Sequence, residues 1–485
     1  MSRRKTAKLS DGTTIDYIET DTPPSGTMKK TYFTPDRSQV VQFFLDQSVG
    51  KDKDREARLR AILGKYNATL AHTEGGSIGT TEQSADYFRK LFCWPTGIVV
   101  EPEIGIVAPT YPDNFFFASG QWKGQEKKGR WFQSAKLRPH LPKEERGDWM
   151  KYLSICIYMA RAIRRLHQAG LAHSDLSSNN VLIDPVSGQS IIIDIDSLVV
   201  PGIYPPDVLG TAGFIAPELL MTQHLQLEDP KRNHPNVRSD LHALAVLIYE
   251  NLLQRHPLRG PKVNSANSPE EDERLSMGEK ALFVEHPTDT SNRPKDIRVP
   301  YTALGPFLSN LITQTFIDGL RNPDQRPVAI QWEQALTKTW DLVHPCLNPK
   351  CEQKWFVLYD EQQKACPFCG TKVKQSVPTL RFRRQVRQGT WVNDGQLTVY
   401  DGLYFFKWHA YSNTIQGEAA DRKPLGYCSF YEGKWIMFNQ NLPYIITNNG
   451  NRVPPGQALE LKDGDEITFP LEHNGRKAIV QFVQV

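Results

Sequence analysis

The stretch that decides the fold is LAHSDLSSNNVLIDPVSGQSIIIDIDS, residues 171–197. The triplets VLI (181–183) and III (191–193) favour β-structure, and the residues DPVSGQS between them favour a turn. Together they predict an antiparallel hairpin that places Asn180 opposite Asp194 at its open end. Amide and carboxylate oxygens in such a position suit a hard cation such as Mg²⁺.

A third polar residue completes the pattern. Asp175 lies five residues before Asn180, in the loop that leads into the hairpin, where its carboxylate can face a substrate hydroxyl. Two metal ligands and a carboxylate that meets a hydroxyl are the parts of a site for phosphoryl transfer. The stretch therefore predicts phosphoryl transfer that depends on Mg²⁺ or Mn²⁺.

The motifs in this part of the chain resemble those of a known family. HSDLSSNN at 173–180 resembles the catalytic loop H-R-D-L-x-x-x-N of the eukaryotic-type protein kinases. DID at 194–196 stands where that family has D-F-G, and APE at 216–218 has the letters of its A-P-E motif. The resemblance extends over about residues 150–343 and implies the two-lobed kinase fold.

The resemblance also implies roles for single residues. Asp175 would orient or deprotonate the attacking hydroxyl. Asn180 and Asp194 would hold Mg²⁺. Arg326, in RNPDQRPVA, would pair with Glu218 of A-P-E. Asp240, on a long apolar helix, would brace the catalytic loop.

Three positions depart from the family pattern. Ser174 replaces the Arg that pairs with a phosphorylated activation loop, which indicates that this switch is absent. Ser177 replaces a Lys that often contacts the transferred phosphate. Asp196 replaces the Gly of D-F-G, which removes backbone freedom at that position.

The nucleotide-binding half matches the family less closely. Kinases of this family have a Gly-rich loop over the phosphates and a Lys on the third strand. Here the candidate loop, residues 20–33, contains Gly26 as its one glycine, and Gln42 takes the position of the Lys in the expected strand 38–44. Glutamine carries no positive charge to pair with phosphates.

Lys29 and Lys30 lie on the preceding strand, from which some kinases supply the missing cation. Since side chains alternate along a strand, one of the two can point into the cleft, and we expect Lys30; two solvated lysines are the alternative. Glu56 is the candidate for the helix glutamate that pairs with the lysine, and a solvated helix face is the alternative. Pro109 and Tyr111 are expected in the hinge that holds adenine.

Four of the seven cysteines follow the spacing C-x4-C, 14 residues, C-x2-C. Thiolates in two close pairs suit tetrahedral Zn²⁺, and a four-thiolate site has no open position for catalysis. The pattern predicts a structural zinc site and resembles a zinc ribbon, with reduced free thiols as the alternative. The expected ligands are Cys346, Cys351, Cys366 and Cys369.

The C-terminal part has a different character. From about residue 378, short aromatic and β-branched runs alternate with turn formers, which predicts an all-β domain. Residues 442–469 resemble the end of a forkhead-associated domain, a β-sandwich that reads phosphothreonine, but the phosphate-reading residues of that family are not evident. His409 is expected in a core or turn. RFRRQVR (381–387) is either a solvated strand or a site for acidic partners.

Composition excludes some classes of protein. The formal charge of +4 over 485 residues is too small to argue for nucleic acid. No apolar run approaches the roughly 20 residues that span a bilayer, and the basic N-terminus lacks the apolar stretch of a secretory signal. We therefore expect a cytoplasmic protein that binds neither nucleic acid nor membrane.

The expected fold class is α+β: a bilobal protein-kinase-like domain with a zinc ribbon and a C-terminal all-β sandwich. The expected boundaries are 1–112 for the kinase N-lobe, 113–343 for the C-lobe with an exposed insertion at about 255–300, 344–374 for the zinc ribbon and 375–485 for the forkhead-associated-like sandwich.

Three hypotheses about function follow. The first is a protein serine/threonine kinase that uses ATP, Mg²⁺ (or Mn²⁺) and a structural Zn²⁺. The second is a pseudokinase scaffold, favoured by Gln42, Asp196 and the single-Gly loop; a small-molecule kinase comes third. The domain combination resembles bacterial kinases linked to tellurite resistance, which act with a von Willebrand-type metal-binding protein and a metal-dependent phosphatase. This resemblance implies a protein substrate.

Overall fold

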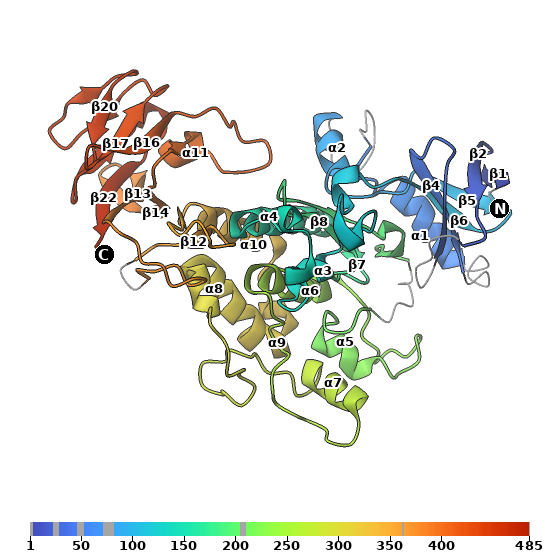
Figure 1. Cartoon of the computed structure of the whole chain (residues 1–485). Helices are drawn as coiled ribbons and strands as arrows, with labels where there is room; N and C mark the ends of the chain where they lie inside the picture. The colour runs from blue at the N-terminus through green and yellow to red at the C-terminus, as the bar shows by residue number, and fades with distance from the viewer. Residues whose placement is uncertain are drawn as a thin grey trace. The chain divides into compact units, whose positions relative to one another are not determined.

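The computed structural model describes residues 3–22, 29–45, 53–70, 82–203, 210–360 and 363–484. The fold contains both helices and strands (Figure 1). The chain divides into two compact units. Unit 1 contains residues 1–147, 151–295 and 312–333, and unit 2 contains residues 148–150, 296–311 and 334–485. Within the described residues, no helix is both long and apolar enough to cross a membrane.

Unit 1 begins with an antiparallel sheet of six strands in the order β2-β1-β5-β6-β4-β3. The strands are β1 (Arg3–Leu9), β2 (Thr14–Glu19), β3 (Lys29–Phe33), β4 (Gln39–Phe44), β5 (Gly97–Glu101) and β6 (Gly105–Pro109). Alternation along β4 explains the packing on both faces. Val41 and Phe43 join the apolar cluster on one face, while Phe44 packs with Leu59 of α1 (Lys53–Leu63) on the other.

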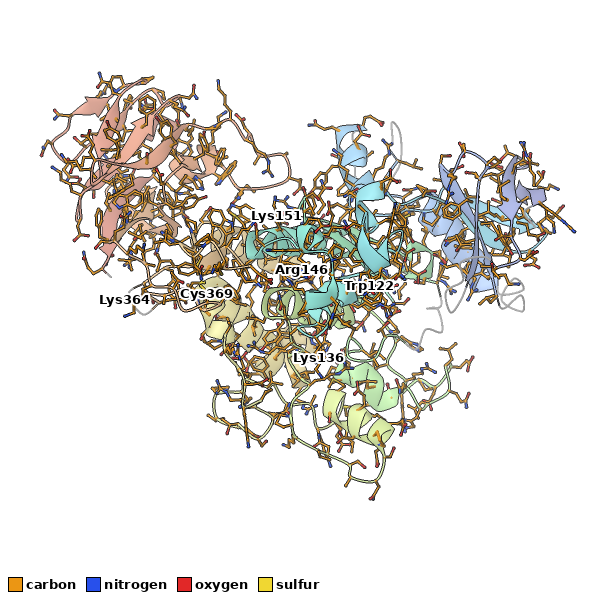
Figure 2. The ribbon with its side chains drawn as sticks, viewed as in Figure 1. Trp122, Lys136, Arg146, Lys151, Lys364 and Cys369 are labelled. Atoms are coloured by element: carbon orange, nitrogen blue, oxygen red, sulfur yellow. The ribbon has the colours of Figure 1, made fainter. Side chains whose placement is uncertain are left out.

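The segment 113–146, between this sheet and the next long helix, consists of loops and short helical turns. Trp122 and Arg146, both labelled in Figure 2, make contacts within this segment. The indole rings of Trp122 and Trp131 lie 4.5 Å apart between centroids. The guanidinium of Arg146 donates to the carbonyl of Leu141 from two nitrogens, at 2.9 and 2.7 Å.

The next part of the chain is mainly helical, and α6 is buried along most of its length. The helices are α2 (Glu82–Arg89), α3 (Gly129–Gln133), α4 (Trp149–Gln168), α5 (Pro217–Thr222), α6 (Val237–Leu253), α7 (Pro269–Met277), α8 (Pro306–Thr313), α9 (Gly319–Arg321) and α10 (Ala329–Trp340). Asn236 and Ser239 form a capping box that starts α6. A helix that is apolar on all sides, as predicted for 239–253, is stable inside a domain.

Residues 255–300, which we expected to form an exposed insertion, are mostly exposed or half-buried and have a few buried anchors. Phe283 is fully buried and stacks on Phe316, with 5.6 Å between ring centroids. The side-chain amide of Asn292 donates to the carbonyls of Leu258 and Leu282 at 3.0 and 2.7 Å. A few buried side chains thus anchor a segment whose other residues are exposed or half-buried.

The predicted hairpin is present as β8 (Val181–Asp184) and β9 (Gln189–Ile192), but its register differs by one residue from our prediction. The backbone N–H of Ile193 donates to the carbonyl of Asn180 at 3.0 Å, so Asn180 lies beside Ile193 and not opposite Asp194. Strand β9 ends before Asp194, which takes a left-handed conformation with φ 64°. This turn re-aims the carboxylate after the strand has ended.

Unit 2 contains the cysteine cluster, the pair β11 (Val343–Pro345) and β12 (Trp355–Val357), and two antiparallel sheets. The larger sheet has the order β14-β13-β22-β21-β18-β19, and the smaller has the order β15-β16-β17-β20. Their elements are β13 (Val377–Arg387), β14 (Thr390–Thr398), β15 (Leu403–Phe405), α11 (Lys407–Ala410), β16 (Gly426–Tyr431), β17 (Lys434–Asn439), β18 (Ile445–Ile446), β19 (Arg452–Val453), β20 (Ala458–Glu460), β21 (Glu466–Thr468) and β22 (Lys477–Val483). Leu380 and Met437, from different sheets, share one buried core, and His409 is buried beside Phe382.

Candidate active site

Asp175 and Asn180 lie in the loop between β7 (Ala172–His173) and β8. The side-chain amide of Asn180 donates to the backbone carbonyl of Asp175 at 2.8 Å and to its carboxylate at 3.0 Å. These bonds engage the amide nitrogen, so the amide oxygen of Asn180 is the atom left to face a cation.

Thr211 fixes the Asp175 carboxylate from the other side. Its backbone N–H donates to Oδ1 at 2.7 Å, and its hydroxyl donates to Oδ2 at 3.2 Å. Sequence reasoning did not assign Thr211 to the site, because its contact with Asp175 joins residues 36 positions apart. With Asn180, Thr211 holds the carboxylate in one orientation.

Backbone bonds fix the catalytic loop. Asp240, on the buried helix α6, accepts the backbone N–H of His173 at 2.7 Å. The His173 imidazole bonds to the carbonyl of Ile193 at 3.0 Å, which ties the loop to the end of the hairpin. The hydroxyl of Ser174, where the kinase family has Arg, donates to the carbonyl of Ser197 at 2.7 Å.

Lys29, on β3, reaches the site from the sheet. Its ammonium lies 2.7 Å from Oδ1 of Asp194 and 2.7 Å from Oδ1 of Asp196. The Lys29 and Asp196 side chains are 12% and 6% exposed, and Asp194 is 33% exposed. Three charged groups of this arrangement therefore meet with little solvent between them.

The pKa values in this trio follow from the geometry. Burial lowers the pKa of Lys29, but the carboxylates of Asp196 and Asp194 raise it by more, and the net shift is upward. Burial raises the pKa of Asp194, but the charge of Lys29 lowers it below its usual value. The pKa of Asp196 stays raised, because burial and the neighbouring Asp194 outweigh Lys29.

The other candidates for nucleotide binding lie elsewhere. Lys30, which we expected in the cleft, is exposed; Lys29 shares a strand face with Gln42, because Thr31 lies opposite Gln42 and Lys29 is two residues away. The side-chain amide of Gln42 donates to the Thr31 hydroxyl at 3.1 Å. Glu56 is 47% exposed and pairs with Arg60 at 2.6 Å, one helical turn away.

Gly26 lies outside the described residues. Pro109 ends β6, and its carbonyl accepts a bond from the Cys93 thiol at 3.5 Å. Tyr111 packs against a buried apolar cluster, and burial raises its pKa well above the usual value. The cluster combines the sheet with the hairpin through Val40, Ala108, Leu182 and Ile193.

Glu218 and Arg326 form a bidentate pair. The two guanidinium nitrogens lie 2.7 and 2.8 Å from the two carboxylate oxygens. Arg326 is buried, and it also donates to the carbonyl of Arg238 at the start of α6. The pair anchors α5 at the end of the segment that carries Thr211.

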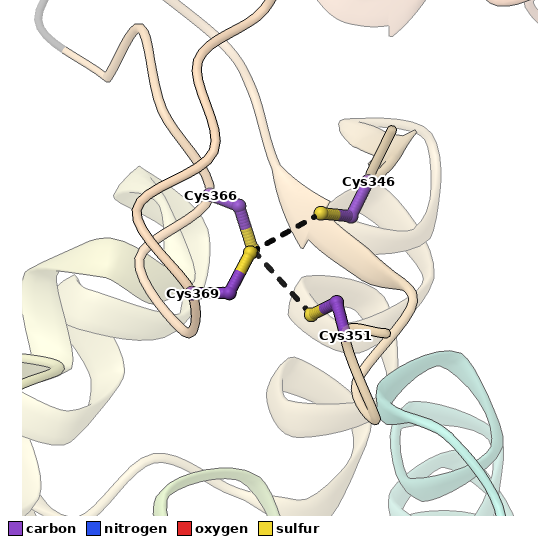
Figure 3. A group of neighbouring side chains, drawn as sticks. All are labelled: Cys346, Cys351, Cys366 and Cys369. Carbon is purple, nitrogen blue, oxygen red and sulfur yellow. Dashed lines mark hydrogen bonds between the residues drawn. The ribbon is translucent and has the colours of Figure 1, made fainter. Parts of the chain in front are cut away.

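The four cysteines of unit 2 converge (Figure 3). All four Sγ atoms lie within 4.8 Å of one another, and the Sγ atoms of Cys346 and Cys369 are 3.5 Å apart. Cys351 and Cys366 are buried, while Cys369 is exposed (Figure 2). Gly370 has φ +74°, which permits the tight turn after Cys369.

The chemistry of these thiols fits a soft divalent metal. Burial raises the pKa of Cys369, but hydrogen bonds from the Thr371 hydroxyl and amide and from Cys346 lower it to about 6. Burial raises the pKa of Cys366. A cation among the four sulfurs would favour the thiolate at each of them. The cluster can hold a zinc ion.

Comparison with known proteins identifies a protein kinase domain, whose sequence model matches residues 133–353. The human (Homo sapiens) anti-Muellerian hormone type-2 receptor is 32% identical over 142 residues, with 24% of this chain and 24% of that protein covered. Serine/threonine-protein kinase WNG2 of Toxoplasma gondii is 26% identical over 145 residues, with 28% and 26% covered. The leucine-rich repeat receptor-like tyrosine-protein kinase PXC3 of Arabidopsis thaliana is 31% identical over 121 residues, with 24% and 12% covered.

The chain thus spans about a quarter or less of the length of these relatives. The predicted mixed α+β architecture, with a kinase domain, a four-cysteine cluster and C-terminal antiparallel sheets, is confirmed. Protein kinase domains use ATP with Mg²⁺.

Proposed function

We propose that this chain is an ATP- and Mg²⁺-dependent protein serine/threonine kinase. The observation that supports it most directly is the clamp on Asp175, whose carboxylate accepts bonds from Asn180 at 3.0 Å and from Thr211 at 2.7 Å. An idle site has no need to hold a carboxylate in one orientation beside two oxygen ligands for a cation.

The residues divide the work of phosphoryl transfer. Asp175 accepts the hydroxyl hydrogen of the substrate and aims the oxygen at the γ-phosphorus. Asn180, through its amide oxygen, and Asp194 hold the metal, which when bound neutralises charge on the phosphates. Lys29 supplies the positive charge that Gln42 lacks. The hydroxyl oxygen gains the phosphoryl group, the bond to the β-phosphate oxygen breaks, and ADP leaves.

We further propose that the four cysteines hold one structural Zn²⁺ and that unit 2 recruits partners. Four thiolates complete a tetrahedral site and leave no position for a substrate. The partners proposed are a von Willebrand-type metal-binding protein and a metal-dependent phosphatase, in keeping with the kinases of tellurite resistance that the sequence resembles.

A pseudokinase scaffold is the second candidate function. It is favoured by Gln42, which bonds to Thr31 and offers no charge to a phosphate. It is also favoured by the Lys29 ammonium on Asp194, since a bound cation competes with Mg²⁺ for that carboxylate. A scaffold of this kind would bind nucleotide weakly or not at all.

The deciding experiment is transfer of labelled γ-phosphate, with Mg²⁺ or Mn²⁺, to the chain itself and to a generic basic protein. The Asp194→Ala variant serves as the control. Label that disappears in the control supports a kinase. No label, together with no nucleotide-induced rise in Tm, would make the chain a scaffold.

A further inference from the structure

We infer that Asp196 anchors Lys29 and takes the place of the helix glutamate that pairs with the lysine in other protein kinases. Asp196 is then a positioning residue for the phosphate-binding cation. This inference rests on the proposed function, since it assigns the partner of the lysine at the same site.

Contacts and burial single out Asp196. The Lys29 ammonium lies 2.7 Å from Asp196, and the two side chains are 12% and 6% exposed. Glu56, the helix candidate, is 47% exposed and bound to Arg60. A buried ion pair with a 2.7 Å contact fixes a long side chain far better than an exposed glutamate does.

The bonding capacity of the ammonium agrees with this role. Lys29 has three N–H donors, and the bonds to Asp194 and Asp196 use two of them. One donor remains for a phosphate oxygen. Lys29, Asp194 and Asp196 together carry a formal charge of −1, and a divalent cation on Asp194 would reverse the sign, which suits the phosphates of ATP. Asp196 keeps Lys29 in place when Asp194 turns to the metal.

Ser174, which replaces the usual Arg, helps to hold the turn that carries Asp196. The short turn of residues 195–197 is tied down by Ser174, whose hydroxyl donates to the carbonyl of Ser197 at 2.7 Å. The Ser197 hydroxyl in turn donates to the carbonyl of Asp194 at 2.9 Å. Asp196 and Ser174 thus replace residues of the usual pattern and compensate together for the loss of charge at Gln42.

The anchor of the lysine lies on a different segment from the one that serves in other protein kinases. In kinases where a helix glutamate anchors the lysine, moving that helix disconnects the ion pair. Here the anchor lies two residues after the metal ligand Asp194. The carboxylate that anchors the lysine and the proposed metal ligand therefore lie on one segment of chain, residues 194–196.

The test compares Asp196→Asn with Glu56→Gln, two substitutions that each remove one carboxylate and keep its shape. The readouts are the KM for ATP, kcat, and the affinity of a fluorescent ATP analogue with Mg²⁺. Asp196→Asn should raise KM and weaken nucleotide binding at least tenfold, with a smaller effect on kcat. Glu56→Gln should stay within twofold. Asp196→Glu should recover part of the loss, because it restores the charge.

A double-substitution cycle of Lys29→Met and Asp196→Asn gives a reading that needs no catalysis. We expect the Tm of the double variant to exceed the value that the two single losses add up to, because each single change leaves a buried charge without its partner. Additive Tm losses, or a Glu56→Gln effect as large as that of Asp196→Asn, would overturn the inference. A wild-type chain that binds nucleotide but transfers no phosphate would overturn the proposed function and leave this reading intact.

Discussion

The catalytic loop and the lysine site both belong to unit 1, but they keep the protein kinase pattern to different degrees. In the loop, Asp175, Asn180 and Asp194 stand at the positions of the family motif. In the lysine site, Gln42 occupies the usual position and Lys29 reaches the carboxylates from the neighbouring strand. The loop keeps the residues of the family motif, whereas the lysine site keeps a positive charge that comes from a different position.

The physical reason lies in how each side chain is held. Asn180 and His173 bond to backbone carbonyls close to the loop, so their positions in the sequence are tied to the path of the chain. Lysine delivers a point charge at the end of a long stem and needs no fixed backbone position. A cation can therefore be supplied from another strand, whereas the loop residues need their own backbone positions.

The largest expected effect concerns the loop. Asp175→Asn removes the negative oxygen that accepts the hydroxyl hydrogen in the proposed mechanism, and its amide nitrogen cannot accept the bond that Asn180 donates to Oδ2. We expect kcat for protein phosphorylation to fall by about 10²–10⁴-fold, with the affinity for ATP within threefold of wild type. Steady-state kinetics and binding of a fluorescent ATP analogue measure the two quantities. An unchanged kcat would place the acceptor site elsewhere in the chain.

The cysteine cluster is another case in which spacing alone fixes the residues. Cys366→Ser removes a buried ligand, and we expect the bound zinc to fall from one per chain to near zero. Because the metal binds the folded cluster and not the unfolded chain, the free energy of unfolding of unit 2 should fall by about 3 kcal/mol or more. Metal analysis and urea unfolding measure these changes.

The matched control for the zinc prediction is Cys93→Ser, which changes a buried cysteine of unit 1 outside the cluster. It should keep one zinc per chain. A wild-type chain purified in the presence of zinc but free of it would contradict the site, and the cysteines would then be reduced thiols.

The lysine site gives a smaller effect. Lys29→Met should raise the KM for ATP at least tenfold, about 1.4 kcal/mol, because it removes the charge that meets the phosphates. Lys30→Met, the matched control on the next residue, should change KM by less than threefold, since Lys30 is exposed. Equal effects would mean that the lysine is not fixed by its strand face, and the contrast between the two halves would weaken.

Sequence reasoning placed the loop residues better than the lysine. Asn180 could be placed from the motif, because its amide bonds to the backbone carbonyl of Asp175 five residues away. The choice between Lys29 and Lys30 depends on the register of β3 against β4, and a shift of one residue exchanges the two faces. The same one-residue error affected the β8–β9 hairpin.

Other features depended on contacts that no local pattern carries. Asp196 was read as a lost glycine, and its pairing with Lys29 joins residues 167 positions apart. Glu56 lies on the helix expected to carry the partner of the lysine, but it forms an ion pair with Arg60 one turn away. Thr211 needs the fold of the segment before A-P-E to reach Asp175. Long-range pairs of this kind follow from the tertiary structure.

The smallest expected effect concerns His256, which contacts the segment that carries Thr211. His256 is buried; its Nε2 donates to the carbonyl of Gly213 at 2.8 Å, and its Nδ1 accepts the backbone N–H of Leu258 at 3.1 Å. Gly213 lies on the segment that carries Thr211. Burial lowers the pKa of His256 to about 3, against the bond to Gly213, which raises it.

This folded-state pKa lies below the value of about 6.5 in the unfolded chain, so the stabilisation is present above pH 6.5 and is lost as the pH falls toward 3. Between pH 7 and pH 5.5 we expect a loss of about 1 kcal/mol in the free energy of unfolding. His256→Gln can make both hydrogen bonds without titrating and should lose less over this range. Urea unfolding at the two pH values measures the difference; parallel losses in both proteins would mean that other groups control the acid sensitivity of this segment.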